Sequence, residues 1–163
     1  KIAARLNVTK GAFYHHHEAK DDVVEACFAR TLSILRQVQD AVEARGGTRL
    51  EQLSEATGTL FRHHVSGDVP ILRISAIAAL SGPIQERIVR EYDQVARHFS
   101  GLVSDGIVDG SIRPVDADVA GLMITALISG ATELKNWSPD VTPETAARAF
   151  AKPLIEGIFS APA

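Results

Sequence analysis

The sequence predicts an all-α protein, with a short helix-turn-helix head followed by a larger helical body. Apolar residues recur with a helical period along several long segments, and no segment keeps the strict alternation of a half-buried strand. Glycine, proline and capping residues mostly stand at the ends of these segments. The 163 residues are 45% hydrophobic and 23% charged, which is an ordinary globular composition.

The first segment, residues 1–20, reads KIAARLNVTKGAFYHHHEAK and predicts two short helices joined by a tight corner. Asn7 tolerates the left-handed backbone conformation that ends a helix. Thr9 is a good N-cap, so the second helix should begin at Lys10. A further helix should begin at Lys20, whose charge and free backbone N–H groups together suit a phosphate.

The second short helix is too polar to belong to a core. Its exposed side mixes residues that hydrogen-bond or carry charge, and such residues can reach phosphates or base edges in a major groove. These residues are Thr9, Lys10, Tyr14, His15 and His16.

The pattern Val8-Thr9-x-Gly11-x-Phe13-Tyr14-x-His16-x-x-x-Lys20 closely resembles the DNA-binding segment of the tetracycline-repressor (TetR) family of bacterial transcription regulators. Two positions depart from the family pattern, because Asn7 replaces its usual Gly and His17 its usual Phe. The family also has a helix before this segment, and this chain begins after it. The resemblance implies phosphate contacts from Tyr14, His16 and Lys20, and base contacts from Thr9, Lys10, Ala12 and His15.

The charge distribution fits a protein that binds DNA through one end. The whole chain has a net charge of −3. Residues 1–20 carry four basic residues against one acidic residue, a local balance of +3, so the remainder sums to −6. Cys27 is the single cysteine, which excludes an intrachain disulfide and fits the cytoplasm.

A long connector helix should run from Lys20 to about Arg45. Val24, Phe28, Leu35 and further apolar residues form its inner stripe, and Gly46-Gly47 ends it. We therefore divide the chain into a DNA-binding domain, residues 1–28, that runs into this helix, and a regulatory and dimerisation domain, residues 29–163.

The body should contain five further helices. They are expected over residues 49–65, 71–80, 83–108 and 116–136, with a last helix from Thr142-Pro143-Glu144. Pro153 should bend this last helix or interrupt one of its backbone hydrogen bonds. The turn at residues 109–114 also resembles the link before the penultimate helix in many members of the same family. No run of eighteen apolar residues occurs, so we expect no membrane span.

The family resemblance implies a cavity in the body for a small apolar or amphipathic effector. Several residues on predicted inner faces are candidates to line it, because apolar walls with a few polar groups suit such a ligand. The candidates are Phe61, His64, Ile74, Ile77, Tyr92, Phe99 and Thr125. The alternative is a plainly packed core.

The last two helices have more apolar faces than one small body can use. Paired with the same helices of a second chain, they would form a four-helix interface, as the resemblance also implies. The candidates are Val119, Met123, Ala126, Leu127, Gly130, Phe150, Leu154 and Ile158. The alternative is that these residues only pack within one chain.

No motif for catalysis, a cofactor or a metal is present. A nucleophile elbow, a phosphate-binding glycine loop and a zinc-binding helix motif are all absent from the sequence. Consecutive residues on a helix point about 100° apart, so His15, His16 and His17 do not converge on one ion. We expect no enzyme.

The sequence thus predicts a cytoplasmic, ligand-responsive homodimer that binds a near-palindromic DNA operator, with repression relieved by a small-molecule effector. Activation in place of repression depends on where the operator lies relative to a promoter. The alternative function is a helical small-molecule carrier or sensor that does not bind DNA.

Overall fold

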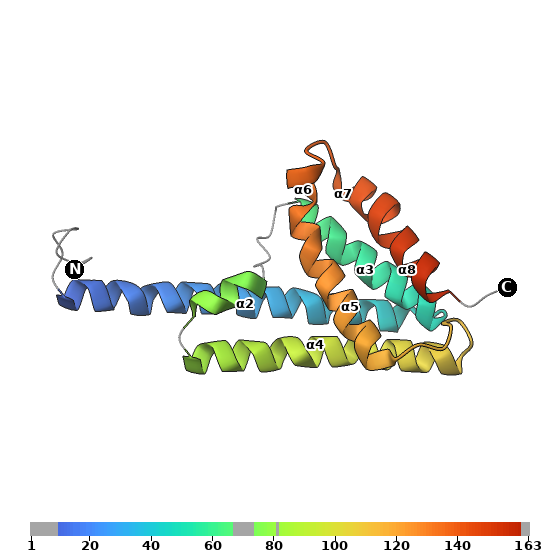
Figure 1. Cartoon of the computed structure of the whole chain (residues 1–163), viewed down its shortest axis with the longest axis horizontal. Coiled ribbons are helices and arrows are strands. Elements are labelled where there is room, and N and C mark those ends of the chain that lie inside the picture. Colours follow the sequence, from blue (N-terminus) through green and yellow to red (C-terminus); the bar gives the residue numbers. More distant parts are fainter. Residues whose placement is uncertain (1–9, 67–73, 81, 161–163) are drawn as a thin grey trace.

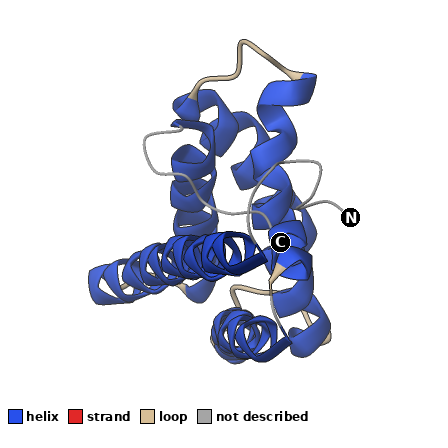
Figure 2. Cartoon of the chain, turned by 90° about the vertical axis from the view of Figure 1, so that its left-hand side faces the viewer, coloured by secondary structure: helices blue, strands red, loops and turns tan. Residues whose placement is uncertain are grey.

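The computed structural model of the chain describes residues 10–66, 74–80 and 82–160. Within these ranges every regular element longer than a single bridge is a helix, and the described part of the chain in Figure 2 contains only helices and loops. An isolated antiparallel bridge joins Ile112 to Ser160. The predicted all-α fold is confirmed.

The longest helix, α2, runs without interruption from Lys10 to Arg45. Its blue N-terminal part extends beyond the other helices in Figure 1. The predicted new helix at Lys20 is wrong. Residues 17–22 contain no glycine or proline, so nothing in the local sequence ends a helix there. The end of α2 matches the prediction, because Gly46 and Gly47 both take positive φ values, 74° and 94°.

Helix α3, Arg49–Ser66, begins with a reciprocal cap. The Glu51 backbone N–H donates to Thr48 Oγ1 at 3.3 Å, and the Thr48 backbone N–H donates to the Glu51 carboxylate at 2.9 Å. This hydrogen bonding holds the pKa of Glu51 below its ordinary value.

The segment between α3 and the next long helix departs from the prediction. Its described residues, 74–80, contain a 3₁₀-helix, η1, over Ile74–Ala79, where an α-helix over residues 71–80 was expected. Pro70 and Gly82 leave too short a run for a stable α-helix, and a 3₁₀ turn is the usual form of such connectors. Helix α4, Gly82–Val108, then follows as predicted.

The penultimate helix is α5, Ala117–Gly130, continued by the 3₁₀-helix η2, Ala131–Glu133, and by α6, Leu134–Trp137. Asp116 caps α5, since its Oδ1 accepts from the backbone N–H groups of Asp118 and Val119 at 3.1 and 3.0 Å. The predicted extent of this helix is confirmed, with a tightened turn inside it.

The C-terminal segment comprises α7, Pro143–Thr145, the π-helix η3, Ala146–Ala151, and α8, Lys152–Phe159. Pro153 lies in the first turn of α8 and has no backbone N–H to donate to the preceding turn. The predicted interruption is therefore present, and its form is a π-helical segment just before the proline.

Helix α3 lies at the centre of the body and contacts α2, α4, α5 and α8. Phe28, Phe61 and Phe99, from α2, α3 and α4, belong to one hydrophobic core and have almost no exposed surface. Helices α4 and α5 approach closely at Gly121, where an added Cβ would lie 2.3 Å from Ser100 Oγ and 2.7 Å from the Ala96 carbonyl oxygen.

Among the described residues, one helical stretch, Ala117–Trp137, is long and apolar enough to cross a membrane by length and composition alone. One such stretch is weak evidence for a span, because core helices of soluble proteins pass the same test. Here a 3₁₀ turn interrupts the stretch, and its α5 part packs on α4.

Candidate ligand cavity and apolar face

A small cavity lies between α2, α3, α4 and α5, with a volume of about 10 Å³. About one water molecule would fill this volume. Four residues predicted to line a pocket are brought together here, and five others join them. The predicted four are His64, Tyr92, Phe99 and Thr125, and the others are Thr31, Leu35, Val95, Ile128 and Ser129.

The remaining predicted pocket residues do not line this cavity. Phe61 and Ile77 are buried in the surrounding core, and the side chain of Ile74 lies outside the described residues. Ser129 could have been found from the sequence, since it lies one helical turn after Thr125 and therefore on the same face. Thr31 lies one helical turn before Leu35 of the predicted inner stripe, and it is fully buried.

The serine and threonine hydroxyl groups of the cavity donate to their own helices. Thr125 Oγ1 donates to the Gly121 carbonyl at 2.8 Å, and Ser129 Oγ donates to the Thr125 carbonyl at 2.9 Å. Thr31 Oγ1 donates to the Cys27 carbonyl at 2.9 Å. A hydroxyl that donates its hydrogen bond in this way can still accept hydrogen bonds through its oxygen lone pairs.

His64 is a titratable side chain of the cavity lining, and burial changes its pKa. Burial, assisted by the nearby charge of His63, lowers the pKa of His64 to about 4. Its Nδ1 atom is buried and has no hydrogen-bond partner among the described residues. The imidazole is therefore neutral near pH 7, with one ring nitrogen unsatisfied.

Tyr92 is the second titratable side chain that lines the cavity. Burial raises the pKa of its phenol to about 12, so the hydroxyl remains protonated. Its ring meets that of Phe28 edge to face, with centroids 6.1 Å apart and an interplanar angle of 83°. Tyr92 thus links the cavity to the core of α2.

Polar pairs join α2 to α4, which run side by side in the same direction (Figure 1). The pairs lie in matching order along the two helices. They are Glu25–Arg87, Arg36–Glu91 at 3.1 Å, Gln39–Val95 carbonyl at 3.4 Å and Glu43–His98 at 3.2 Å. Thr31 and Leu35 of the cavity lie within this paired stretch of α2, so the cavity interrupts it.

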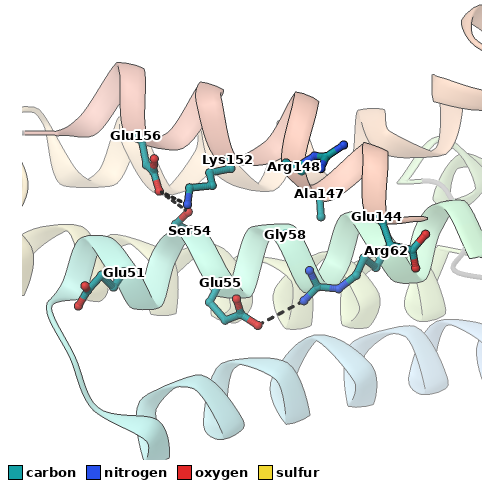
Figure 3. Close-up of a pocket in the computed structure, with 10 residues that line it drawn as sticks. All are labelled: Glu51, Ser54, Glu55, Gly58, Arg62, Glu144, Ala147, Arg148, Lys152 and Glu156. Atoms are coloured by element: carbon teal, nitrogen blue, oxygen red, sulfur yellow. Dashed lines mark hydrogen bonds and ion pairs between the residues drawn. The ribbon is translucent and has the colours of Figure 1, made fainter. Parts of the chain in front are cut away.

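The larger hollow of the body is a polar groove of about 630 Å³ between α3 and the C-terminal helices (Figure 3). Four of its charged residues form two ion pairs. Arg62 contacts Glu55 at 3.3 Å, and Glu156 contacts Lys152 at 3.6 Å and Ser54 at 3.3 Å. This groove was not predicted from the sequence.

A second, apolar groove of about 280 Å³ lies between α5 and α8. Two large apolar side chains that line it remain exposed in the single chain, Met123 at 52% and Leu154 at 39%. Val119 and Leu122, also on α5, are 51% and 61% exposed. Of the predicted dimer residues, Ala126 and Gly130 are also exposed, and Leu127, Phe150 and Ile158 are half-buried. All eight are thus at least partly accessible, and their role at an interface stays a prediction.

The predicted DNA contacts lie outside the described side chains. Thr9 precedes the described residues, and the side chains of Lys10, Ala12, Tyr14, His15, His16 and Lys20 are not described, although their backbone belongs to α2. Among the described residues no group of three or more histidine, cysteine or acidic side chains could hold a metal ion.

A family model described as "Tetracyclin repressor-like, C-terminal domain" matches residues 46–157. This range covers more than half of the chain and includes the cavity-lining parts of α3, α4 and α5. A comparison with curated protein sequences gave no match.

Solved structures share the fold at low sequence identity. A bacterial regulatory protein of the tetR family from Rhodococcus RHA1 is 20% identical, with a TM-score of 0.64 over 99% of this chain and 85% of that chain. AibR, in complex with isovaleryl coenzyme A and operator DNA, is 22% identical, with a TM-score of 0.67 over 97% and 84%. A TetR/AcrR family regulator from Thermobifida fusca YX-ER1 is 19% identical, with a TM-score of 0.66 over 96% and 84%.

Proposed function

Because this chain belongs to the tetracycline repressor-like family of transcription regulators, we propose that it is a ligand-responsive repressor that leaves its DNA operator when an effector binds. The proposal takes the active form to be a cytoplasmic homodimer without catalytic activity. The observation that carries it is the cavity between α2 and α4, because α2 also contains six of the seven predicted DNA contacts.

Support for DNA binding comes from the N-terminal segment of the sequence. Its dense match to the family's DNA-binding pattern coincides with a local charge of +3 on a chain of net charge −3. AibR, which shares this fold, was solved with operator DNA. We propose that residues 1–28 form the DNA-binding part and that residues 29–163 regulate it.

The proposed dimer forms through the exposed apolar face of α5 and α8. Burying Met123, Leu154 and their neighbours against the same face of a second chain would remove a large apolar surface from water. Two heads would then reach successive major grooves, about 34–36 Å apart.

The proposed response to the effector starts at the cavity. A ligand larger than one water has to separate α2 from α4 near Thr31 and Tyr92, within the stretch held by the polar pairs. Helix α2 has 36 residues and spans about 54 Å, so a small tilt at its middle moves its N-terminal end farther. The changed spacing between two heads would weaken DNA binding, provided that the effector favours the tilted form.

The test is a titration of a DNA fragment from the protein's own upstream region, followed by fluorescence anisotropy at several salt concentrations. Lys20→Ala should weaken binding to all sequences and reduce the slope of log affinity against log salt by about 1. Tyr14→Phe should weaken binding in the same sequence-independent way.

Lys135→Ala is the matched control, because Lys135 is an exposed lysine far along the chain on α6. It should leave both affinity and slope unchanged. Unchanged DNA affinity in the Lys20 and Tyr14 variants would defeat the contact assignment. Absence of any DNA binding by the unaltered protein would favour the carrier or sensor function instead.

A further inference from the structure

The cavity between α2, α3, α4 and α5 has a lining without charged side chains. None of its nine lining residues is an aspartate, glutamate, lysine or arginine. A carboxylate or phosphate placed here would lose its water shell without a cation to pair with, which is strongly unfavourable. An ammonium group would likewise find no carboxylate. The cavity therefore selects against ions of either sign.

Apart from the Tyr92 hydroxyl, which keeps its proton and can donate, the polar side chains of the cavity present hydrogen-bond acceptors. The hydroxyls of Thr125 and Ser129 already donate hydrogen bonds to helical carbonyls at 2.8 and 2.9 Å, so their oxygens present lone pairs to the cavity as acceptors. His64 Nδ1 is buried without a partner among the described residues, and a neutral imidazole nitrogen accepts a hydrogen bond when the other nitrogen holds the proton. A ligand that donates a hydrogen bond would satisfy these atoms.

The rest of the wall is apolar. Leu35, Val95, Phe99 and Ile128 are all buried and lie beside the polar atoms. A ligand that occupies this place therefore needs an apolar body next to its polar end.

We propose that the effector enters this cavity with an uncharged hydrogen-bond donor, such as a hydroxyl or amide N–H, and that His64 Nδ1 is its acceptor. The inference rests on the proposed function in taking this cavity as the effector site. It adds the chemical class of the ligand's buried end and the residue that recognises it. His64 determines specificity, since an unsatisfied acceptor penalises a ligand that lacks the donor.

Three small probes of similar size separate the possibilities. Phenol is neutral and donates a hydrogen bond, anisole has no donor, and benzoate is an anion near pH 7. Their binding to the full chain can be measured from the imidazole ¹⁵N and ring proton resonances of His64, assigned by comparison with His64→Phe. Phenol should shift these resonances and bind about tenfold more tightly than anisole, and benzoate should not bind.

Variants separate recognition from folding. His64→Phe keeps a ring in place but removes the acceptor, so the preference for phenol over anisole should fall to within about twofold. This preference can be followed in the variant through the resonances of Phe99 and Tyr92. Thr125→Val is a second, nearly isosteric variant that should also weaken phenol relative to anisole. His63→Gln, a change beside the cavity, should retain the full preference, because His63 does not line it.

Equal binding of phenol and anisole, tighter binding of benzoate, or no binding of any probe would overturn the proposal. The same protein tested for DNA binding keeps the two ideas separate. DNA binding without probe selectivity refutes the ligand class alone, and probe selectivity without DNA binding refutes the regulatory function alone.

Discussion

At the scale of single residues, His64 should make folding sensitive to acid. Its pKa is lowered to about 4 in the folded chain, from an ordinary value of 6.5. Between these values the unfolded chain binds more protons than the folded one, so the free energy of unfolding rises with pH. Stability from this group is complete above about pH 6.5 and is lost as the pH falls toward about 4.

This effect can be measured by urea unfolding at about pH 7.5 and about pH 5. The protein should lose about 2 kcal/mol more stability over this interval than His64→Gln, which cannot titrate. His63→Gln is the neighbouring control and should keep most of the acid sensitivity. An identical loss in the original protein and in His64→Gln would show that His64 is accessible to protons when folded.

Gly121 is a second residue with a specific structural requirement. Its backbone lies so close to α4 that the Cβ of an alanine would lie 2.3 Å from Ser100 Oγ and 2.7 Å from the Ala96 carbonyl. Gly121→Ala should therefore destabilise the protein by about 1–3 kcal/mol. Gly101→Ala on the exposed face of α4 meets nothing within 4 Å. It should leave stability unchanged or raise it slightly, as thermal unfolding of both variants would reveal.

At the scale of elements, the N-terminus of α5 depends on Asp116. Its carboxylate accepts two backbone hydrogen bonds, from Asp118 and Val119. Asp116→Ala should cost about 1 kcal/mol in chemical denaturation. Asp140→Ala, in the exposed turn after α6, is the control and should cost much less. Equal effects of the two substitutions would mean that the cap contributes nothing.

The helices themselves could be predicted where apolar periodicity and terminal signals agreed. Gly46-Gly47 ended α2 as expected, and the span of α4 followed from its regular stripe. The expected helix start at Lys20 rested on its suitability for binding a phosphate, while the local residues contain no helix breaker and favour a continuous helix. The π-helix before Pro153 was not foreseeable in detail, since a missing N–H predicts an interruption but not its form.

The cavity could be predicted only in part for a related reason. Periodicity placed His64, Tyr92, Phe99 and Thr125 on inner faces, and these residues do meet. Phe61 has the same sequence signature but packs into the core, because the rotation of α3 against α2 decides which inner residue faces a gap. Such rotations depend on packing between helices and are not encoded in one helix alone.

At the scale of the whole molecule, the apolar face of α5 and α8 should hold two chains together. Met123→Glu places a charge in the middle of this face and should convert the dimer to a monomer in light scattering. Val89→Glu is a matched control, since Val89 on α4 is 50% exposed and Met123 is 52% exposed. The control should stay dimeric. A dimer that survives Met123→Glu but not Val89→Glu would place the interface on α4.

The central claim is that the paired body determines whether two heads can bind DNA together. The most direct measurement is the affinity of Met123→Glu, compared with that of Val89→Glu and the unaltered protein, for DNA from the protein's own upstream region. A monomeric Met123→Glu should lose about a hundredfold or more in affinity, because the second head no longer binds at high effective concentration. A monomeric variant that binds this DNA as tightly as the unaltered dimer would contradict the account.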